Sequence, residues 1–221
     1  MKRKHFAVLA LGCFAAAAVS ACTAQEDTAA RSASIDADAS ASIRGPAAPP
    51  PEAGESRIAV VYFSEPETAD RRAVQGSTEA IARIIWDRTG GALLRIERDA
   101  PYPSSHDALV SEARGERDRD SRPPIRSLGD LSGYDTIFLG YPIWWYDMPM
   151  PVYSFLETYD LSGKTIIPFV THGGSGLTGT ADRIAAAEPG ADVRGPAYEV
   201  YRTDVPEAEP SVLRWLGRLG F

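Results

Sequence analysis

The chain has 221 residues, which is enough for one domain with a well-packed core or for two small ones. Its formal net charge is −7 at pH 7, and an acidic surface argues against nucleic acid as a partner and against a basic face lying on anionic lipid. The two cysteines are Cys13 and Cys22, so any domain beyond them has no disulfide, no thiolate metal site and no cysteine nucleophile.

The first 22 residues have the pattern of a bacterial lipoprotein signal. Residues 2–4 are basic, and residues 6–19 are an apolar stretch too short for a comfortable membrane span. The next residues end in V-S-A-C, which resembles the lipobox: an aliphatic residue, two small residues and then Cys22. The resemblance implies cleavage of a signal peptide at residues 1–21, lipidation of Cys22, and a protein exported and lipid-anchored at the cell envelope, on the periplasmic side in a Gram-negative cell. An ordinary secretory signal with a chance cysteine is the alternative.

Residues 22–56 are predicted to form a disordered tether. They are rich in Ala, Ser, Asp and Pro, and Ile35 and Ile43 are their only large apolar residues. Such a segment buries too little apolar surface to offset the entropy lost on ordering. We therefore expect a flexible tether, stiffer near its prolines, that holds a domain of residues 57–221 away from the membrane.

From residue 57 onward, short apolar runs alternate with helical patterns. The first run, I-A-V-V-Y-F, is continuous, as in a strand that a parallel sheet buries on both faces. Strands are predicted at residues 58–63, 92–96, 136–141 and 165–170, and residues 192–201 are predicted to contain a fifth, weaker strand. Helices are predicted at residues 80–88, 105–119, 151–159, 181–187 and 210–219. The alternation predicts an α/β fold: a doubly wound, five-stranded parallel sheet of order 2-1-3-4-5 with helices on both faces.

In a sheet of this kind, ligands bind at the carboxyl ends of the strands where the strand order reverses. The loop after the first strand ends in Gly76, Ser77 and Thr78, where a helix begins. Free N–H groups and the helix dipole favour a phosphate there, and the hydroxyls of Ser64, Ser77 and Thr78 add donors. The same residues also suit an ordinary helix cap.

The loops after the third and fourth strands complete the predicted site. Residues 140–151 hold two tryptophans, two tyrosines and three prolines. The aromatic rings suit a fused aromatic ligand, and the prolines would hold the backbone rigid; a hydrophobic cluster under the next helix is the alternative. Residues 171–176 hold three glycines in four positions, which let the backbone approach a planar ligand. We interpret His172 as a hydrogen-bonding group rather than an acid or base, because no carboxylate partner is evident by spacing. No catalytic residue and no metal site are predicted.

Residues 130–176 resemble a branch of the flavodoxin-like proteins that bind flavin mononucleotide (FMN). Two motifs carry the resemblance, Y-P-I-W-W at residues 141–145 and T-H-G-G-S-G at residues 171–176, and it extends from about residue 57 to about residue 201. It implies FMN as the cofactor. It places along the isoalloxazine ring Pro142, Ile143, Trp144 and Trp145. It places at the ring edge and the ribityl side Thr171, His172, Gly173, Gly174 and Ser175.

The phosphate loop departs from the family pattern. This branch often reads Y-F-S followed later by G-N-T, whereas here residues 62–64 are followed by G-S-T only after an eleven-residue insert, residues 65–75. Serine replaces asparagine and can still donate, so FMN binding is expected to survive. The insert also brings both acidic and basic residues near the phosphate.

Three functions are compatible with these features. Because a flavin supplies the chemistry while the protein sets its potential and access, we predict electron transfer with an unidentified redox partner outside the cytoplasmic membrane. The alternative is an FMN-dependent NAD(P)H:quinone-type oxidoreductase, although no second nucleotide motif is visible. A flavin-free binding module with the same fold is the third alternative, and the altered phosphate loop is its main support.

Overall fold

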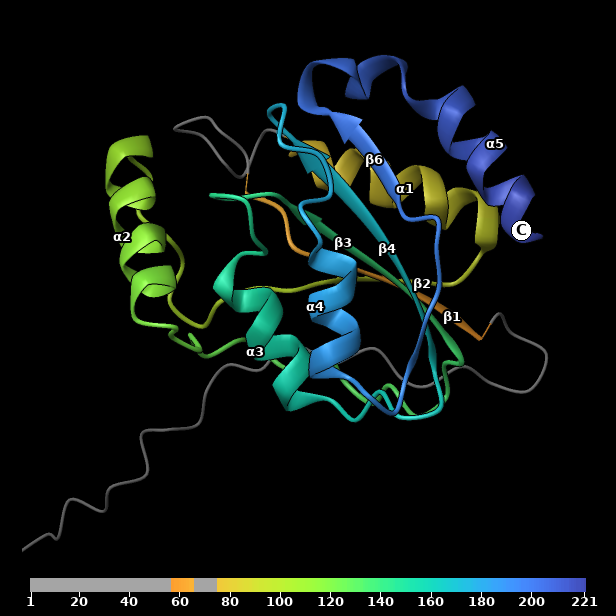
Figure 1. Ribbon diagram of the computed structural model, residues 1–221, viewed down its shortest axis with the longest axis horizontal. Coiled ribbons are helices and arrows are strands. Elements are labelled where there is room, and N and C mark those ends of the chain that lie inside the picture. The colour runs from red at the N-terminus through yellow and green to blue at the C-terminus, as the bar shows by residue number, and fades with distance from the viewer. Residues whose placement is uncertain (1–56, 66–74) are drawn as a thin grey trace, which may run out of the picture. The chain divides into compact units, whose positions relative to one another are not determined.

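The computed structural model describes residues 57–65 and 75–221. The predicted signal, the tether and residues 66–74 of the insert lie outside the described residues. Strands and helices alternate along the described chain (Figure 1). The strands are β1 (Ile58–Tyr62), β2 (Ala92–Arg95), β3 (Thr136–Pro142), β4 (Thr165–His172), β5 (Asp192–Val193) and β6 (Tyr198–Tyr201). The helices are α1 (Ser77–Thr89), α2 (His106–Asp118), α3 (Met150–Thr158), α4 (Thr180–Ala187), the 3₁₀ helix η1 (Arg202–Glu207) and α5 (Glu209–Leu219).

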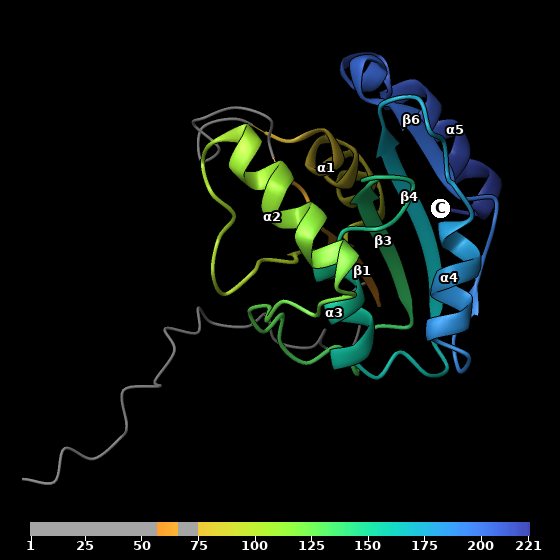
Figure 2. The ribbon, with the colours of Figure 1, turned by 60° about the vertical axis from the view of Figure 1, so that its left-hand side comes forward.

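The strands form one parallel sheet of order β2-β1-β3-β4-β5, in which β6 also pairs with β4. The predicted order 2-1-3-4-5 is therefore confirmed. All strand pairs are parallel, so the strands end at the same edge of the sheet, which the arrowheads of β3 and β4 mark in Figure 2. This carboxyl edge is where the three predicted loops begin.

The fifth position of the sheet contains two strands instead of the single predicted one. Beyond β4, β5 pairs with Thr165 and Ile166, and β6 pairs with residues 169–172. The Ile166 carbonyl accepts the Arg194 N–H at 2.8 Å, and alternate residues of a strand face the same neighbour, so Pro168 faces that side too. Because proline has no N–H to donate, the ladder stops there and the chain leaves the sheet before it returns as β6.

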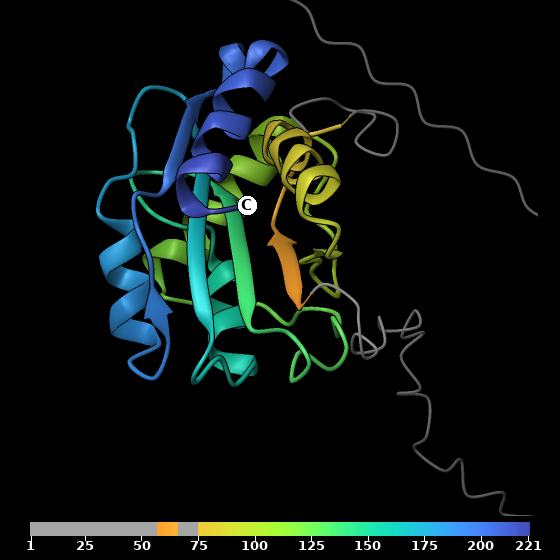
Figure 3. The same ribbon diagram turned by 90° about the vertical axis from the view of Figure 1, so that its right-hand side faces the viewer.

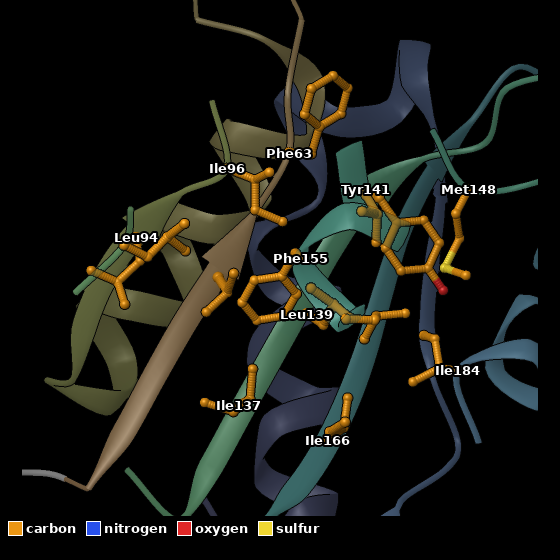
Figure 4. Packing of buried hydrophobic residues seen from close by; sticks show 14 of the residues in the cluster. Phe63, Leu94, Ile96, Ile137, Leu139, Tyr141, Met148, Phe155, Ile166 and Ile184 are labelled. Carbon is orange, nitrogen blue, oxygen red and sulfur yellow. The ribbon is translucent and has the colours of Figure 1, made fainter. Parts of the chain in front are cut away.

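Helices cover both faces of the sheet. On one face α1 and α5 lie side by side (Figure 3), and their apolar residues pack on a cluster that includes Phe138 and Phe169. On the other face lie α2, α3 and α4 (Figure 1), which pack on a second apolar cluster. Figure 4 shows part of this cluster, including Phe155 of α3 and Ile184 of α4. Gly140 of β3 allows the Phe169 ring to lie against the strand, because a Cβ there would come within 2.1 Å of that ring. The buried strands thus give the carboxyl-edge loops a rigid base.

No helix in the described part of the chain is both long and apolar enough to cross a bilayer.

Candidate functional site

A cavity of about 530 Å³ lies at the carboxyl edge, where the loops after β1, β3 and β4 meet. All of the predicted cofactor-binding residues line it except Gly174 and Ser175. The predicted residues at the cavity are Ser64, Gly76, Ser77, Thr78, Pro142, Ile143, Trp144, Trp145, Thr171, His172 and Gly173. The three loops, far apart in sequence, therefore border one space.

The N-terminus of α1 opens on this cavity without a side-chain cap. Gly76 is the N-cap residue, and its φ of −75° and ψ of 156° are ordinary extended values. The Glu79 N–H donates to the Ser64 Oγ at 3.3 Å, so this serine helps to hold the start of the helix. The N–H groups of Ser77 and Thr78 precede the first intrahelical donor, and the described residues offer them no acceptor. An anion in the cavity would accept these hydrogen bonds.

The acidic residue in the first turn of α1 is paired with two arginines. The Arg83 guanidinium donates to the Glu79 carboxylate at 2.8 and 3.0 Å, and this hydrogen bond raises the pKa of Arg83. The Arg95 guanidinium lies 4.0 Å from the same carboxylate and donates to the Ser64 carbonyl at 2.7 Å. The pairing offsets the negative charge that would otherwise repel an anion beside α1.

Two buried hydroxyls join the start of α1 to the end of β4. The Oγ1 atoms of Thr78 and Thr171 are 2.8 Å apart, and these residues are only 1% and 2% exposed. One bond between two hydroxyls uses one of their two hydrogens. The other hydrogen has no acceptor among the described residues, and both threonines line the cavity. A ligand with acceptor oxygens fits this unfilled donor.

Trp144 forms a wall of the cavity, and two other aromatic rings support it. Its ring packs edge-on against Phe63 at a centroid distance of 5.5 Å and against Tyr102 at 5.8 Å. The Tyr102 hydroxyl donates to the buried Glu116 carboxylate at 2.5 Å, and burial raises the pKa of this tyrosine far above its ordinary value. The support from Tyr102 and Glu116 is not indicated by the sequence, because their partners come from separate segments.

Trp144–Asp147, which we call the tryptophan turn, forms a tight two-residue hairpin. The N–H of Trp144 donates to the Asp147 carbonyl at 2.9 Å, and the Asp147 N–H donates back at 3.0 Å. Its two central residues, Trp145 and Tyr146, have φ values of 48° and 66°. Left-handed backbone costs a residue other than glycine roughly 1–2 kcal/mol, so this turn is strained. Tyr146 is 71% exposed at its tip, while Trp145 lines the cavity.

His172 holds the loop after β4. Its Nδ1 accepts the Gly174 N–H at 3.0 Å, and its ring packs edge-on against Tyr201. Gly174 has a φ of 119°, which side chains rarely allow, so the chain turns there and Ser175 does not line the cavity. This geometry agrees with the interpretation of His172 as a hydrogen-bonding group. The Ile143 N–H donates to the Thr171 carbonyl at 2.9 Å, which joins this loop to the one after β3.

Several residues of the cavity were not predicted. His106, Leu109 and Val110 reach it from α2, and Arg202 reaches it from η1. The inward side of α2 is visible in the sequence as an apolar pattern, but nothing local places that helix at the carboxyl edge. Within residues 57–65 and 75–221, no group of three or more His, Cys, Asp or Glu side chains is arranged to hold a metal ion.

Comparison with known proteins adds a family and several structural relatives. The family model described as Flavodoxin matches residues 58–198. Among curated proteins, none matches the chain.

A solved flavoprotein from Bacteroides eggerthii is 28% identical, with a TM-score of 0.58 over 74% of this chain and 98% of that one. A flavoprotein from Bacteroides uniformis is 27% identical, with a TM-score of 0.59 over 74% of this chain and 99% of that one. A flavoprotein from Lactobacillus acidophilus, solved in complex with FMN, is 17% identical, with a TM-score of 0.53 over 68% of this chain and 96% of that one. At 17% identity, the similarity to the Lactobacillus acidophilus flavoprotein shows a shared fold.

Proposed function

The chain belongs to the flavodoxin family, and from this premise we propose that it binds FMN non-covalently in the cavity at the carboxyl edge of its sheet. The observation that carries the proposal is that one cavity joins the N-terminus of α1, where two N–H groups have no acceptor among the described residues, to a wall of two tryptophans. The Lactobacillus acidophilus flavoprotein, which has this fold and was solved with FMN, supports the choice of cofactor.

The residues at the cavity fit the parts of FMN. The first turn of α1 and the Ser77 hydroxyl would hold the phosphate, with Arg83 and Arg95 offsetting the charge of Glu79. The unfilled hydroxyl hydrogen of the Thr78–Thr171 pair would meet an acceptor oxygen of the ligand. The two indoles would exclude water from the ring system. Bound FMN supplies the capacity to take up and release electrons, and the protein sets its potential and access.

Binding is tested on the purified protein by its visible spectrum and by quenching of added FMN fluorescence. We expect a flavin spectrum, or quenching that saturates at one FMN per chain. The variant Gly76→Val should bind more weakly, because valine can adopt the extended backbone of this position but adds bulk at a residue that lines the cavity. Gly217→Val is the control, since a Cβ at that glycine meets no atom within 4 Å. A colourless protein that leaves FMN fluorescence unchanged would support the flavin-free alternative instead.

For the bound flavin we propose electron transfer with a redox partner, without a dedicated organic substrate. The family supports this role, and the sequence has no second nucleotide motif. A reductase is the second candidate, favoured by the apolar side chains of Leu109 and Val110 on the α2 side of the cavity, where His106 is the polar neighbour. Steady oxidation of NADH or NADPH by the FMN-loaded protein with a quinone acceptor would favour the reductase; its absence would favour the carrier.

We propose further that the protein is exported and anchored through a lipid on Cys22. The support is the basic and apolar pattern of residues 1–21 and the V-S-A-C ending. Expression in bacteria fed labelled palmitate should label the wild type and the Cys13→Ala control but not Cys22→Ala. Label that survives in Cys22→Ala would contradict the anchor.

A further inference from the structure

The Asp147 carboxylate ties the tryptophan turn to two helices. Its Oδ1 accepts the Met148 N–H at 2.7 Å and the Tyr153 hydroxyl of α3 at 2.8 Å. The same oxygen pairs closely with the Arg183 guanidinium of α4, which also donates to the Tyr146 carbonyl at 3.3 Å. One carboxylate oxygen thus joins the turn, α3 and α4.

These contacts hold a conformation that the turn's own residues disfavour. In a two-residue hairpin of this type, both central positions require a positive φ, so Asn and Gly are the preferred residues there. Here the central residues are Trp145 and Tyr146, so the local sequence opposes the turn and the contacts around it must hold it. The Asp147 side chain is 24% exposed and that of Arg183 is 44% exposed, so the carboxylate end of the ion pair is partly shielded from solvent.

At neutral pH, the side chains of Tyr153 and Arg183 are protonated, as their contacts with Asp147 require. Burial and the hydrogen bond to Asp147 raise the pKa of Tyr153 to about 12, so its hydroxyl remains a donor. The hydrogen bond to Asp147 raises the pKa of Arg183. The Arg117 guanidinium of α2 adds a further contact, 5.3 Å from the Trp145 ring centre.

We propose that Asp147, with Tyr153 and Arg183, is a positioning residue that keeps Trp144 and Trp145 preformed as the wall of the cavity before a ligand binds. The inference rests on the proposed FMN binding for its functional consequence. We call the contacts of Asp147 with Tyr153 and Arg183 the clamp. If the clamp is lost, the tryptophan turn adopts other conformations part of the time. The apparent FMN affinity then falls in proportion to the fraction of chains in which the turn is still formed. The side chains that touch the ligand would stay unchanged in such a variant.

The first arm of the test uses the flavin-free protein. The chain has four tryptophans, and 5-fluorotryptophan labelling gives each a ¹⁹F resonance, assigned by single Trp→Phe variants. In Arg183→Met we expect the Trp144 and Trp145 resonances to shift or broaden, with those of Trp86 and Trp215 unchanged. Arg57→Met is the matched control, because Arg57 also pairs with a carboxylate, that of Asp135, but at the start of β1, away from the carboxyl edge.

The second arm measures FMN affinity. Arg183→Met should weaken binding about tenfold or more, as expected for the loss of a hydrogen-bonded charge pair, whereas the Arg57 control should not. Arg183→Lys should restore part of the loss, because it returns the charge without the planar geometry of the guanidinium.

The outcomes separate the two proposals. Unchanged Trp144 and Trp145 resonances in Arg183→Met would overturn the clamp, and so would changes in all four tryptophans, which would mean a general loosening. Altered resonances with unchanged FMN affinity would overturn its role in binding. If the wild type binds no FMN, the proposed function fails, while the resonances still decide whether the clamp preforms the turn.

Discussion

The hydrogen bond between Thr78 and Thr171 predicts a specific pattern in a double-mutant cycle. The two hydroxyls are 2.8 Å apart, and both residues are nearly inaccessible. Replacing Thr171 by Val keeps the branched shape but leaves the Thr78 hydroxyl without its partner. Thr78→Val does the same to Thr171, while the double variant removes both hydroxyls together.

The magnitude follows from the cost of a buried polar group without a partner. Each single variant should lower the free energy of unfolding by about 1–3 kcal/mol, whereas removing both partners comes closer to neutral. The double variant should therefore cost less than the sum of the singles by about 1 kcal/mol or more. In a domain of this size, each kcal/mol shifts the melting temperature by roughly 2–4 °C.

Urea unfolding of the flavin-free proteins, followed by near-UV circular dichroism, measures the cycle. Saturating FMN should then stabilise the wild type more than the double variant, because the remaining hydroxyl hydrogen is available to the ligand. Strictly additive single effects would refute the reasoning, because they would show that the two hydroxyls do not interact. Equal stabilisation by FMN would refute the part that concerns the ligand.

Three further predictions follow from other contacts. Gly140→Ala should destabilise the fold by at least about 1–3 kcal/mol in thermal unfolding, because its Cβ would come within 2.1 Å of the Phe169 ring. The pKa of Tyr153 is raised to about 12 in the folded protein, so its contribution to stability should be complete below pH 10 and lost as the pH rises from 10 to 12; an unfolding series in Tyr153→Phe should show a weaker fall over that range. Trp145→Ala should weaken FMN binding in a fluorescence titration, whereas Trp86→Ala on the outer side of α1 should not.

The fold was largely predictable because its signals are local. Continuous apolar strands alternate with helical patterns, and Gly90 ends α1 in the left-handed conformation, as glycine does at many helix ends. The split of the last strand into β5 and β6 depends on the direction in which Pro168 faces, which is known only once β4 is paired. The 3₁₀ helix η1 has no hydrophobic period that would mark it.

The sequence predicted which loops form the site, but it predicted less of what individual residues do there. The three loops were predicted to lie together because ligands in such sheets bind where the strand order reverses. However, Thr78 and Thr171 lie 93 residues apart, and nothing local shows that their hydroxyls bond to each other. The contributions of α2 and η1, and the exclusion of Gly174 and Ser175, likewise depend on tertiary packing.

The interrupted fifth position has a consequence for how copies of this protein meet one another. A long, regular sheet edge offers unpaired N–H and C=O groups that another chain can pair with, which leads to aggregation. Here that edge consists of two short strands, of two and four residues, separated where Pro168 has no hydrogen to give, and β2 at the opposite edge has only four residues. Within residues 57–65 and 75–221, a neighbouring chain would find no extended template on either side. If the proposed lipid anchor concentrates the molecules at a membrane surface, these short edges would limit sheet-to-sheet pairing between neighbours.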